Sequence, residues 1–246
     1  GENGSEETII AIIDTGVDWD HPDLLNNVWQ NLDEDADGDG HTLELSGFQW
    51  SLDPGDLNGI DNGGNGFIDD LIGWNFITND GDPNPIQGNP DGAHGTHCAG
   101  ISNGVTNNGT GIASIGWNLT LMPVCVIGNN TNNGYDGMIY AAENGADIIS
   151  ASWGNWEYSE ADQEVIDYVT GLGSIVVAAA GNNNDDYPMY PSSYLGVISV
   201  ASVNVDDTKA AYSSFGPPVD ISVPGGGSEA GILSTMPGGL YQLGFG

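Results

Sequence analysis

Three polar residues stand at the start or the end of a chain segment, where a side chain can point into a cleft. Asp14 ends the apolar run IIAIID, His94 opens the glycine-rich stretch HGTHCAG, and Asn182 ends the run VVAAAGN. An aspartate at a strand end can hold one ring nitrogen of a histidine and fix its tautomer. An asparagine amide can donate to a developing oxyanion. The three residues together predict general-base and oxyanion chemistry.

Asp14 also opens the tripeptide DTG, which allows two other interpretations. An aspartic protease carries DTG after an apolar run, but it needs two carboxylates that share a proton. The chain has no second DTG or DSG sequence, so this interpretation lacks its second carboxylate. Taken alone, Asp14 could also be a structural cap at the end of a strand.

The acidic stretch 33–44 has the pattern of a calcium-binding loop, with Gly38 at the sharp-turn position and Glu44 at position twelve. Its candidate ligands are Asp33, Asp35, Asp37, Asp39 and Glu44. Alternate spacing turns successive carboxylates toward one point, and the final glutamate can bind through both oxygens. The alternative is a solvated acidic loop. Because no good helix flanks the stretch, a paired EF-hand domain is not expected.

A second stretch, 56–70, is a weaker candidate for the same ion. Its possible ligands are Asp61, Asn65 and Asp69, with Asp56 or Asp70 beside them. Both stretches lie within 31–92, a segment rich in Asp, Asn, Gly and Pro that reads as an insertion. A structureless segment of that length is unusual in a compact domain. Bound Ca²⁺ would order it by neutralising carboxylates that repel one another.

The elements that must position these residues alternate along the chain. Short runs, apolar at nearly every position, predict strands buried on both faces at 8–14, 119–126, 146–152, 174–180 and 196–202. Helical patterns fall at 94–103, 135–145 and 159–173. Gly145 is a stop signal, and Ser159 with Asp162 forms a possible capping box. The alternation predicts an α/β fold with a parallel sheet, whose site lies at the carboxyl ends of the strands.

The charge balance excludes two classes of partner. The chain has 35 acidic residues and one basic residue, Lys209, and its formal net charge is −34. Such a surface repels nucleic acid and anionic membranes, so neither is expected as a partner. Divalent-metal binding and solubility of a secreted protein in high salt are both compatible with this charge.

Cys98 and Cys125 are too few for a disulfide scaffold, and we expect two buried thiols, although one bridge is possible.

Four motifs occur in the order found in subtilisin-like serine proteases, the subtilases. They are DTG at 14–16, HGTHCAG at 94–100, SWG at 152–154 and AAAGN at 178–182. The segments 190–194, 213–225 and 232–239 are similar to later parts of the same family. The resemblance implies a three-layer subtilisin-like fold: a central, mainly parallel sheet with helices on both faces. It also implies one peptidase domain over residues 1–246, with the acidic calcium-binding insertion at about 31–92.

The resemblance assigns roles by motif. Asp14 looks like the triad aspartate, His94 like the general base and Asn182 like the oxyanion donor, while His97 is structural. Ser152, Trp153 and Gly154 resemble the strand that pairs with extended substrate, and Ala180 and Gly181 resemble a wall of the primary specificity pocket. The family often has a further calcium site, for which Asp23 and Asn108 are the matching residues.

The nucleophile motif of the family, G-T-S-M-A-x-P, is not present in the chain. Gly246 could be its first glycine, which would place the serine just beyond residue 246. None of the other candidates is in a suitable position: Ser150, Ser152, Ser213, Ser214, Ser234 and Cys98. We therefore expect a fold truncated at its C-terminal end, inactive alone, with the serine in the following sequence or in a separate C-terminal fragment.

The expected function is that of a secreted, calcium-stabilised endopeptidase that hydrolyses polypeptides with an Asp-His-Ser triad. The alternative is a catalytically inactive pseudoprotease, or a calcium-dependent module that binds peptides without cleaving them. No run of apolar residues is long enough to span a membrane, and no signal peptide is visible. A secreted protein of this sequence would be a processed form.

Overall fold

The sheet is built around β1 (Ile9–Asp14), whose first five residues are all apolar. In the computed structural model, which describes residues 4–128, 131–227 and 230–246, β1 lies between β5 (Thr120–Cys125) and β8 (Ile148–Ala151). Both neighbours are parallel to β1. A strand with parallel partners on both sides is covered by other elements above and below, which explains why its run is continuously apolar.

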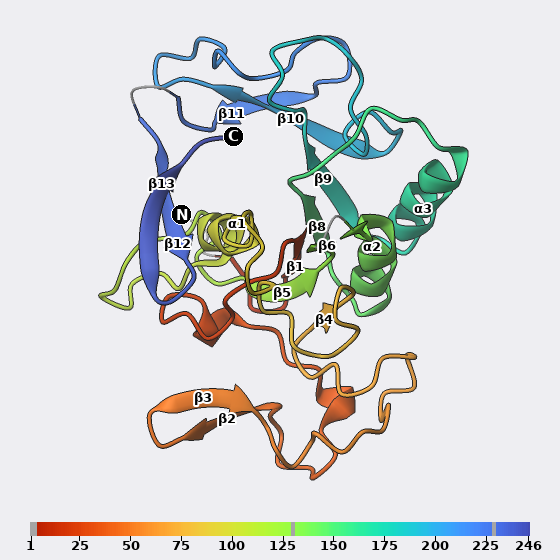
Figure 1. The fold of residues 1–246 in the computed structure, drawn as a ribbon, viewed down its shortest axis with the longest axis vertical. Coiled ribbons are helices and arrows are strands. Elements are labelled where there is room, and N and C mark those ends of the chain that lie inside the picture. Colours follow the sequence, from red (N-terminus) through yellow and green to blue (C-terminus); the bar gives the residue numbers. More distant parts are fainter. Residues whose placement is uncertain (1–3, 129–130, 228–229) are drawn as a thin grey trace.

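The remaining strands extend the sheet on both sides of this centre (Figure 1). They are β9 (Ile175–Ala179), β10 (Val197–Val203), β11 (Ile221–Pro224) and the short β4 (Trp74–Asn75). The order across the sheet is β11-β10-β9-β8-β1-β5-β4, and every adjacent pair is parallel. The predicted parallel α/β sheet is therefore confirmed, and its five predicted strands are all present.

Helices cover both faces of the sheet, which confirms the three-layer fold. Helix α1 (His94–Asn103) lies on one side, and α2 (Gly134–Glu143) and α3 (Glu160–Gly171) lie on the other (Figure 1). Alternate residues of β1 supply the two cores: Ala11 and Ile13 belong to the cluster with α2 and α3. Ile10 and Ile12 belong to the cluster that includes Ala99 of α1. None of the helices in the described ranges is long and apolar enough to cross a membrane.

Local signals in the sequence set the helix ends. The hydroxyl of Ser159 accepts a hydrogen bond from the Asp162 amide at 3.3 Å, so it caps α3 as predicted. Helix α2 ends two residues before Gly145, whose φ of +84° suits glycine best. The three predicted helices thus begin and end within about two residues of their predicted bounds.

A hairpin of β12 (Ile232–Met236) and β13 (Leu240–Gly244) covers α1. Ser234 donates its hydroxyl hydrogen to the His97 carbonyl at 2.6 Å, and Thr235 donates to the Thr96 carbonyl at 2.7 Å. Gly100 of α1 has no room for a Cβ, because such an atom would overlap both hydroxyl oxygens. The hairpin therefore packs against α1 at the distance that only glycine allows.

The acidic insertion extends from one end of the sheet and has little regular structure (Figure 1). It contains the hairpin β2 (Leu43–Ser46) and β3 (Gln49–Leu52) and the 3-10 helix Leu32–Glu34. A second 3-10 helix, Leu25–Asn27, precedes the insertion. After β5, the short strand β6 (Ile127–Gly128) pairs with β7 (Thr131–Asn132). Leu43 and Leu52, which are paired at the base of the β2–β3 hairpin, pack against the core cluster of α1, whereas Phe48 at the β2–β3 turn is exposed.

Candidate active site

Asp14 and His94 meet at the carboxyl edge of the sheet. Asp14 is the last residue of β1 and is 1% exposed, and His94 is the first residue of α1. Nδ1 of His94 lies 2.8 Å from Oδ1 of Asp14, and the Thr15 amide donates to the same oxygen at 2.7 Å. A Cβ on Gly95 would overlap the Gly16 carbonyl oxygen, so α1 begins in direct contact with the strand end. The structure thus places these two predicted residues in hydrogen-bonding contact.

The hydrogen bond fixes how the imidazole can react. The Asp14 carboxylate accepts the hydrogen of Nδ1, so in the neutral ring Nε2 has the free lone pair. The bond to Asp14 raises the pKa of His94, the nearby Cys98 thiol adds to the increase, and burial opposes it. Such a ring takes up a proton at Nε2 and stays paired with the carboxylate as an imidazolium.

The two cysteines are both free thiols. Cys98 is only half-buried, which corrects the expectation of two buried thiols, and it lies one helical turn after His94 with its Sγ 4.0 Å from Nδ1 of His94. It approaches the nitrogen that faces Asp14 rather than the reactive one. Cys125 is fully buried at the end of β5, where burial raises the pKa of its thiol to about 12. Neither thiol is thus placed as a nucleophile.

His97 lies against the hairpin rather than in the site. Its Nε2 is 3.2 Å from the Gln242 carbonyl oxygen, and burial lowers the pKa of its ring. These contacts fit the structural role implied by the family resemblance.

Asn182 follows β9, two strands away from β1 at the same edge of the sheet. Gly181, with a φ of +109°, turns the chain out of the strand, and the side chain of Asn182 is exposed. The amide nitrogen Nδ2 of Asn182 is 3.6 Å from the position of a Cβ on Gly246. Among the described residues, no serine or threonine hydroxyl is hydrogen-bonded to the His94 ring.

Ser152, Trp153 and Gly154 directly follow β8, between β1 and β9. The indole of Trp153 donates from Nε1 to the Ile13 carbonyl at 2.8 Å and stacks edge-on against Tyr135. Its side chain therefore anchors this segment to β1.

Met189 lies in this neighbourhood and was not recognised from the sequence. A Cβ on Gly154 would come within 2.7 Å of Met189 Cγ, and a Cβ on Gly181 within 2.9 Å of its Cε. Ala180, which precedes Gly181, is buried, and the Ala180 amide donates to the Val200 carbonyl at 2.9 Å. Met189 thus occupies the space between two glycines that are 27 positions apart in the sequence, a separation that gives no local signal.

Asp23 and Asn108 are also brought together. Asn108 Nδ2 donates to Asp23 Oδ1 at 2.7 Å, and the Ile112 amide donates to Oδ2 at 2.8 Å. Asp23 is fully buried with a donor on each oxygen. These contacts satisfy Asp23 without an ion, so calcium at this position stays a prediction.

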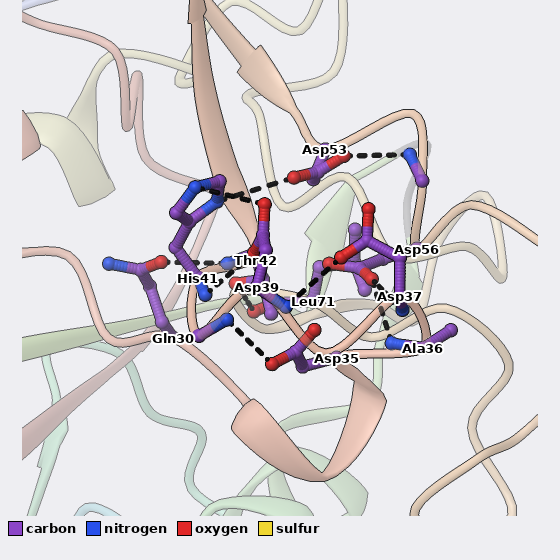
Figure 2. Close-up of polar contacts among 12 residues, drawn as sticks. Gln30, Asp35, Ala36, Asp37, Asp39, His41, Thr42, Asp53, Asp56 and Leu71 are labelled. Carbon is purple, nitrogen blue, oxygen red and sulfur yellow. Dashed lines mark hydrogen bonds and ion pairs between the residues drawn. The ribbon is translucent and has the colours of Figure 1, made fainter.

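In the acidic insertion, some of the predicted ligands lie close together and others lie apart. The carboxylates of Asp35, Asp37 and Asp39 lie within 4.8 Å of one another, and those of Asp39 and Asp53 form a second such group with His41. Asp33 is exposed on the 3-10 helix, and Glu44 is exposed on β2 opposite Ser51. The structure thus brings Asp35, Asp37 and Asp39 of the predicted twelve-residue register together (Figure 2) and leaves Asp33 and Glu44 outside this group.

The second stretch forms a compact loop around Asp61. Its carboxylate accepts hydrogen bonds from the amides of Gly64, Asn65 and Gly66. Asp69 instead accepts hydrogen bonds from the amides of residues 58 and 59. Asp70 is buried and bonded to Tyr140, and burial raises the pKa of its carboxyl to about 6.

Comparisons with known proteins identify the family to which this fold belongs. The subtilase family model matches residues 5–243. Thermitase of Thermoactinomyces vulgaris is 34% identical over 236 residues, which cover 94% of this chain and 66% of thermitase. The halolysin-like extracellular serine protease Nep of Natrialba magadii is 30% identical over 227 residues, 91% of this chain and 35% of Nep. A protease of Pseudoalteromonas arctica aligns with a TM-score of 0.68 at 29% identity, covering 98% of this chain and 74% of that one.

The Asp14–His94 pair contributes stability that depends on pH, in a direction set by the raised pKa of His94. The contribution is fully present below about pH 6.5, the ordinary histidine pKa, and is lost as the pH rises through the higher folded-state pKa. Asp14→Asn removes the partner charge. We therefore expect its loss of unfolding free energy, measured in urea, to be larger near about pH 6 than in the alkaline range. The same change at exposed Asp91 should show no such trend, and parallel pH curves for both variants would contradict the assignment.

Proposed function

From the premise that the chain belongs to the subtilase family, we propose that it forms most of the catalytic domain of a secreted, calcium-stabilised serine endopeptidase. The family model that matches the chain is that of the subtilases, and the relative Nep is named as an extracellular serine protease. The chain spans 66% of thermitase and 35% of Nep, so the activity of the whole protein is part of the proposal.

The observation that carries the proposal is the 2.8 Å contact between a buried Asp14 and a half-exposed His94. Burying a carboxylate is unfavourable unless it is paired and hydrogen-bonded, and here the pairing orients an imidazole toward solvent. His94 Nε2 then takes the proton of a serine hydroxyl as that oxygen attacks a peptide carbonyl carbon. The protonated ring next gives this proton to the leaving amine, and water releases the acyl group by the reverse roles.

The serine itself is proposed to lie outside residues 1–246. Support comes from Gly246, which lies beside the amide of Asn182 and whose own amide donates to the Gly225 carbonyl at 3.2 Å. A residue that follows this position would start close to the oxyanion donor. Asn182 Nδ2 would then hold the negative oxygen of the tetrahedral intermediate.

The proposed substrate is an extended polypeptide lying along residues 152–154. Because the Trp153 indole is hydrogen-bonded to β1, this side chain points inward. The backbone of residues 152–154 is then left for a peptide to pair with. In this mode backbone hydrogen bonds supply affinity, and side-chain pockets supply selectivity. Gly181 and Met189 would form part of the pocket for the residue before the scissile bond.

Calcium is proposed as the resident ion, since carboxylate clusters in the insertion offer the oxygen ligands that it prefers. When bound, it supplies charge neutralisation and takes no part in the proton transfers. Its removal by a chelator is expected to leave the Asp14–His94 contact in place but to loosen the insertion.

The family assignment of the nucleophile is tested by labelling the natural protein with a serine-directed phosphonate. We expect one modified serine, located by peptide mass spectrometry outside residues 1–246. His94→Ala should abolish labelling and lower kcat by a factor of roughly 10⁶, the size of this loss in subtilisin itself. A labelled serine within residues 1–246, or peptide binding with no labelling and no turnover, would contradict the proposed mechanism.

The oxyanion role of Asn182 has its own kinetic signature. Asn182→Ala should lower kcat by roughly 10²–10³ and leave KM nearly unchanged, because the amide bonds only the developing anion. Asn183→Ala changes the exposed neighbour in the same way and should keep wild-type kcat. A rise in KM without a fall in kcat at Asn182 would assign this residue to ground-state binding instead.

Met189 is expected to restrict the residue that precedes the cleaved bond. Since its side chain fills the space between Gly154 and Gly181, small side chains should be preferred there. Met189→Gly should raise kcat/KM for a phenylalanine substrate relative to an alanine substrate by roughly tenfold or more. An unchanged ratio between the two substrates would show that Met189 is not part of the pocket.

A further inference from the structure

Lys209 is the only basic residue of the chain, and its contacts are unusual for so acidic a protein. Its ammonium group donates to the side-chain oxygen Oδ1 of Asn184 at 2.7 Å and to the carbonyl oxygens of Ala210 and Ser213, each at 3.0 Å. The same group lies over the Phe215 ring, 5.3 Å from its centre. An ammonium group has three hydrogens, so the three oxygen acceptors use all of them.

None of these partners is a carboxylate. The ion pairs found in the described ranges all involve histidine, although the chain has 35 acidic residues. Exposed pairs of lysine with a carboxylate contribute little to stability, and on so acidic a surface they are the expected contacts of a lysine. Lys209 is itself exposed, so its three uncharged oxygen partners indicate a role in positioning the chain rather than in neutralising charge.

The side-chain partner of Lys209 lies in the loop 181–185, two residues after the proposed oxyanion donor Asn182. Asn184 has a φ of +54°, a left-handed conformation that asparagine adopts more readily than most residues other than glycine. Its amide donates to the Tyr212 carbonyl at 2.8 Å, while its side chain accepts from Lys209. Lys209 and Tyr212 together therefore hold Asn184 in the conformation at which the chain turns.

The loop 181–185 is bound to the segment 209–215 at other points as well. The Ser214 amide donates to the Gly181 carbonyl at 2.8 Å, and the Ser214 hydroxyl accepts from the Asn183 amide at 3.4 Å. Ser214 thus bonds to the residues on both sides of the oxyanion donor.

The segment 209–215 is itself anchored to β10, the strand next to β9 (Figure 1). The Ala210 amide donates to the Ser202 carbonyl at 3.0 Å, and the Ser213 hydroxyl accepts from the Ser202 amide at 2.9 Å. Because Lys209 bonds to the carbonyl oxygens of Ala210 and Ser213 as well as to the loop, its ammonium group connects the loop to the part of the segment that the sheet holds.

The side chain of Asn182 has no comparable anchor. It is exposed, and none of the hydrogen bonds found among the described residues involves its amide group. The direction of this amide is therefore set by the backbone on either side of it. A misplacement of about 1 Å at a reacting group can lower a rate by roughly 10²-fold. The contacts that fix the neighbours of Asn182 thus decide how well it can hold an oxyanion.

We infer that Lys209 is a positioning residue for the oxyanion donor. It fixes the conformation of Asn184, and the loop then directs the amide of Asn182 toward the reacting carbonyl oxygen. The ammonium group does not touch the substrate and takes no part in the proton transfers. The inference rests on the proposed function, because it concerns the step in which Asn182 holds the negative oxygen.

Steady-state kinetics of the natural protein tests this inference with Lys209→Met, which keeps an apolar stem and removes the ammonium group. Its kcat should fall roughly tenfold, less than in Asn182→Ala, and its KM should stay near the wild-type value. Asn184→Gly keeps the left-handed conformation but removes the acceptor of Lys209, so it should have the same effect. Adding Lys209→Met to Asn182→Ala should lower kcat no further, whereas independent effects would multiply.

Thr208→Ala is the matched control. The Thr208 hydroxyl donates to Asp206 at 2.6 Å and accepts from the Asn204 side chain at 3.0 Å. The change therefore removes polar contacts from the turn beside Lys209 without touching the loop 181–185, and it should keep wild-type kcat. Circular dichroism at the assay temperature checks that each variant is folded.

Four results would overturn the inference. The first is wild-type kcat in Lys209→Met together with the expected loss in Asn182→Ala, which leaves the proposed function in place. The second is a double variant in which the two losses multiply. The third is a loss of kcat in Thr208→Ala as large as that in Lys209→Met. The fourth is unchanged kcat in Asn182→Ala, which would also remove the oxyanion role from the proposed mechanism.

Discussion

The burial of one carboxylate at the end of β1 is the constraint on which the rest of the structure depends. Asp14 is removed from water by the sheet and by α1, so its oxygens must be paired inside the protein. The partners are the Thr15 amide and the imidazole of His94, and both require α1 to start in contact with the strand end. Gly95 permits that contact on one side of α1, and Gly100 permits the approach of the β12–β13 hairpin on the other. Gly95 and Gly100, the two glycines of HGTHCAG, therefore contribute to the position of His94 as much as its hydrogen bond to Asp14 does.

Local patterns in the sequence were sufficient for the three helices and for five strands of the sheet, but not for β4 and β11. Continuous apolar runs identify strands with partners on both sides, and caps such as Ser159 identify helix ends, because these signals act over a few residues. The pairing of Asp14 with His94 also followed from the sequence, since both stand at ends of elements that a parallel sheet brings to one edge. The resemblance to a family then added roles that no local pattern contains.

Other features depend on contacts between distant residues, and these could not be predicted. Met189 fills a space defined by two glycines in separate segments, and the hairpin over α1 is set by hydroxyl bonds to helix carbonyls. In the insertion, the spacing of acids predicted calcium ligands from Asp33 to Glu44, and the structure brings Asp35, Asp37 and Asp39 of that register together but leaves Asp33 and Glu44 outside the group. Glu34 and Asp56 are fully buried, although the spacing of acids in this segment does not set them apart from their exposed neighbours.

The single lysine has a consequence for how the protein survives among other peptidases. A chain with one basic residue in 246 offers enzymes that cut after lysine or arginine a single peptide bond. The ammonium group of Lys209 is held by the Asn184 side chain and by the carbonyl oxygens of residues 210 and 213, and it lies 5.3 Å from the centre of the Phe215 ring. To enter a foreign specificity pocket, this side chain must leave all of these contacts, so the loop has to open first. Digestion by a trypsin-like enzyme would therefore report how often this loop opens.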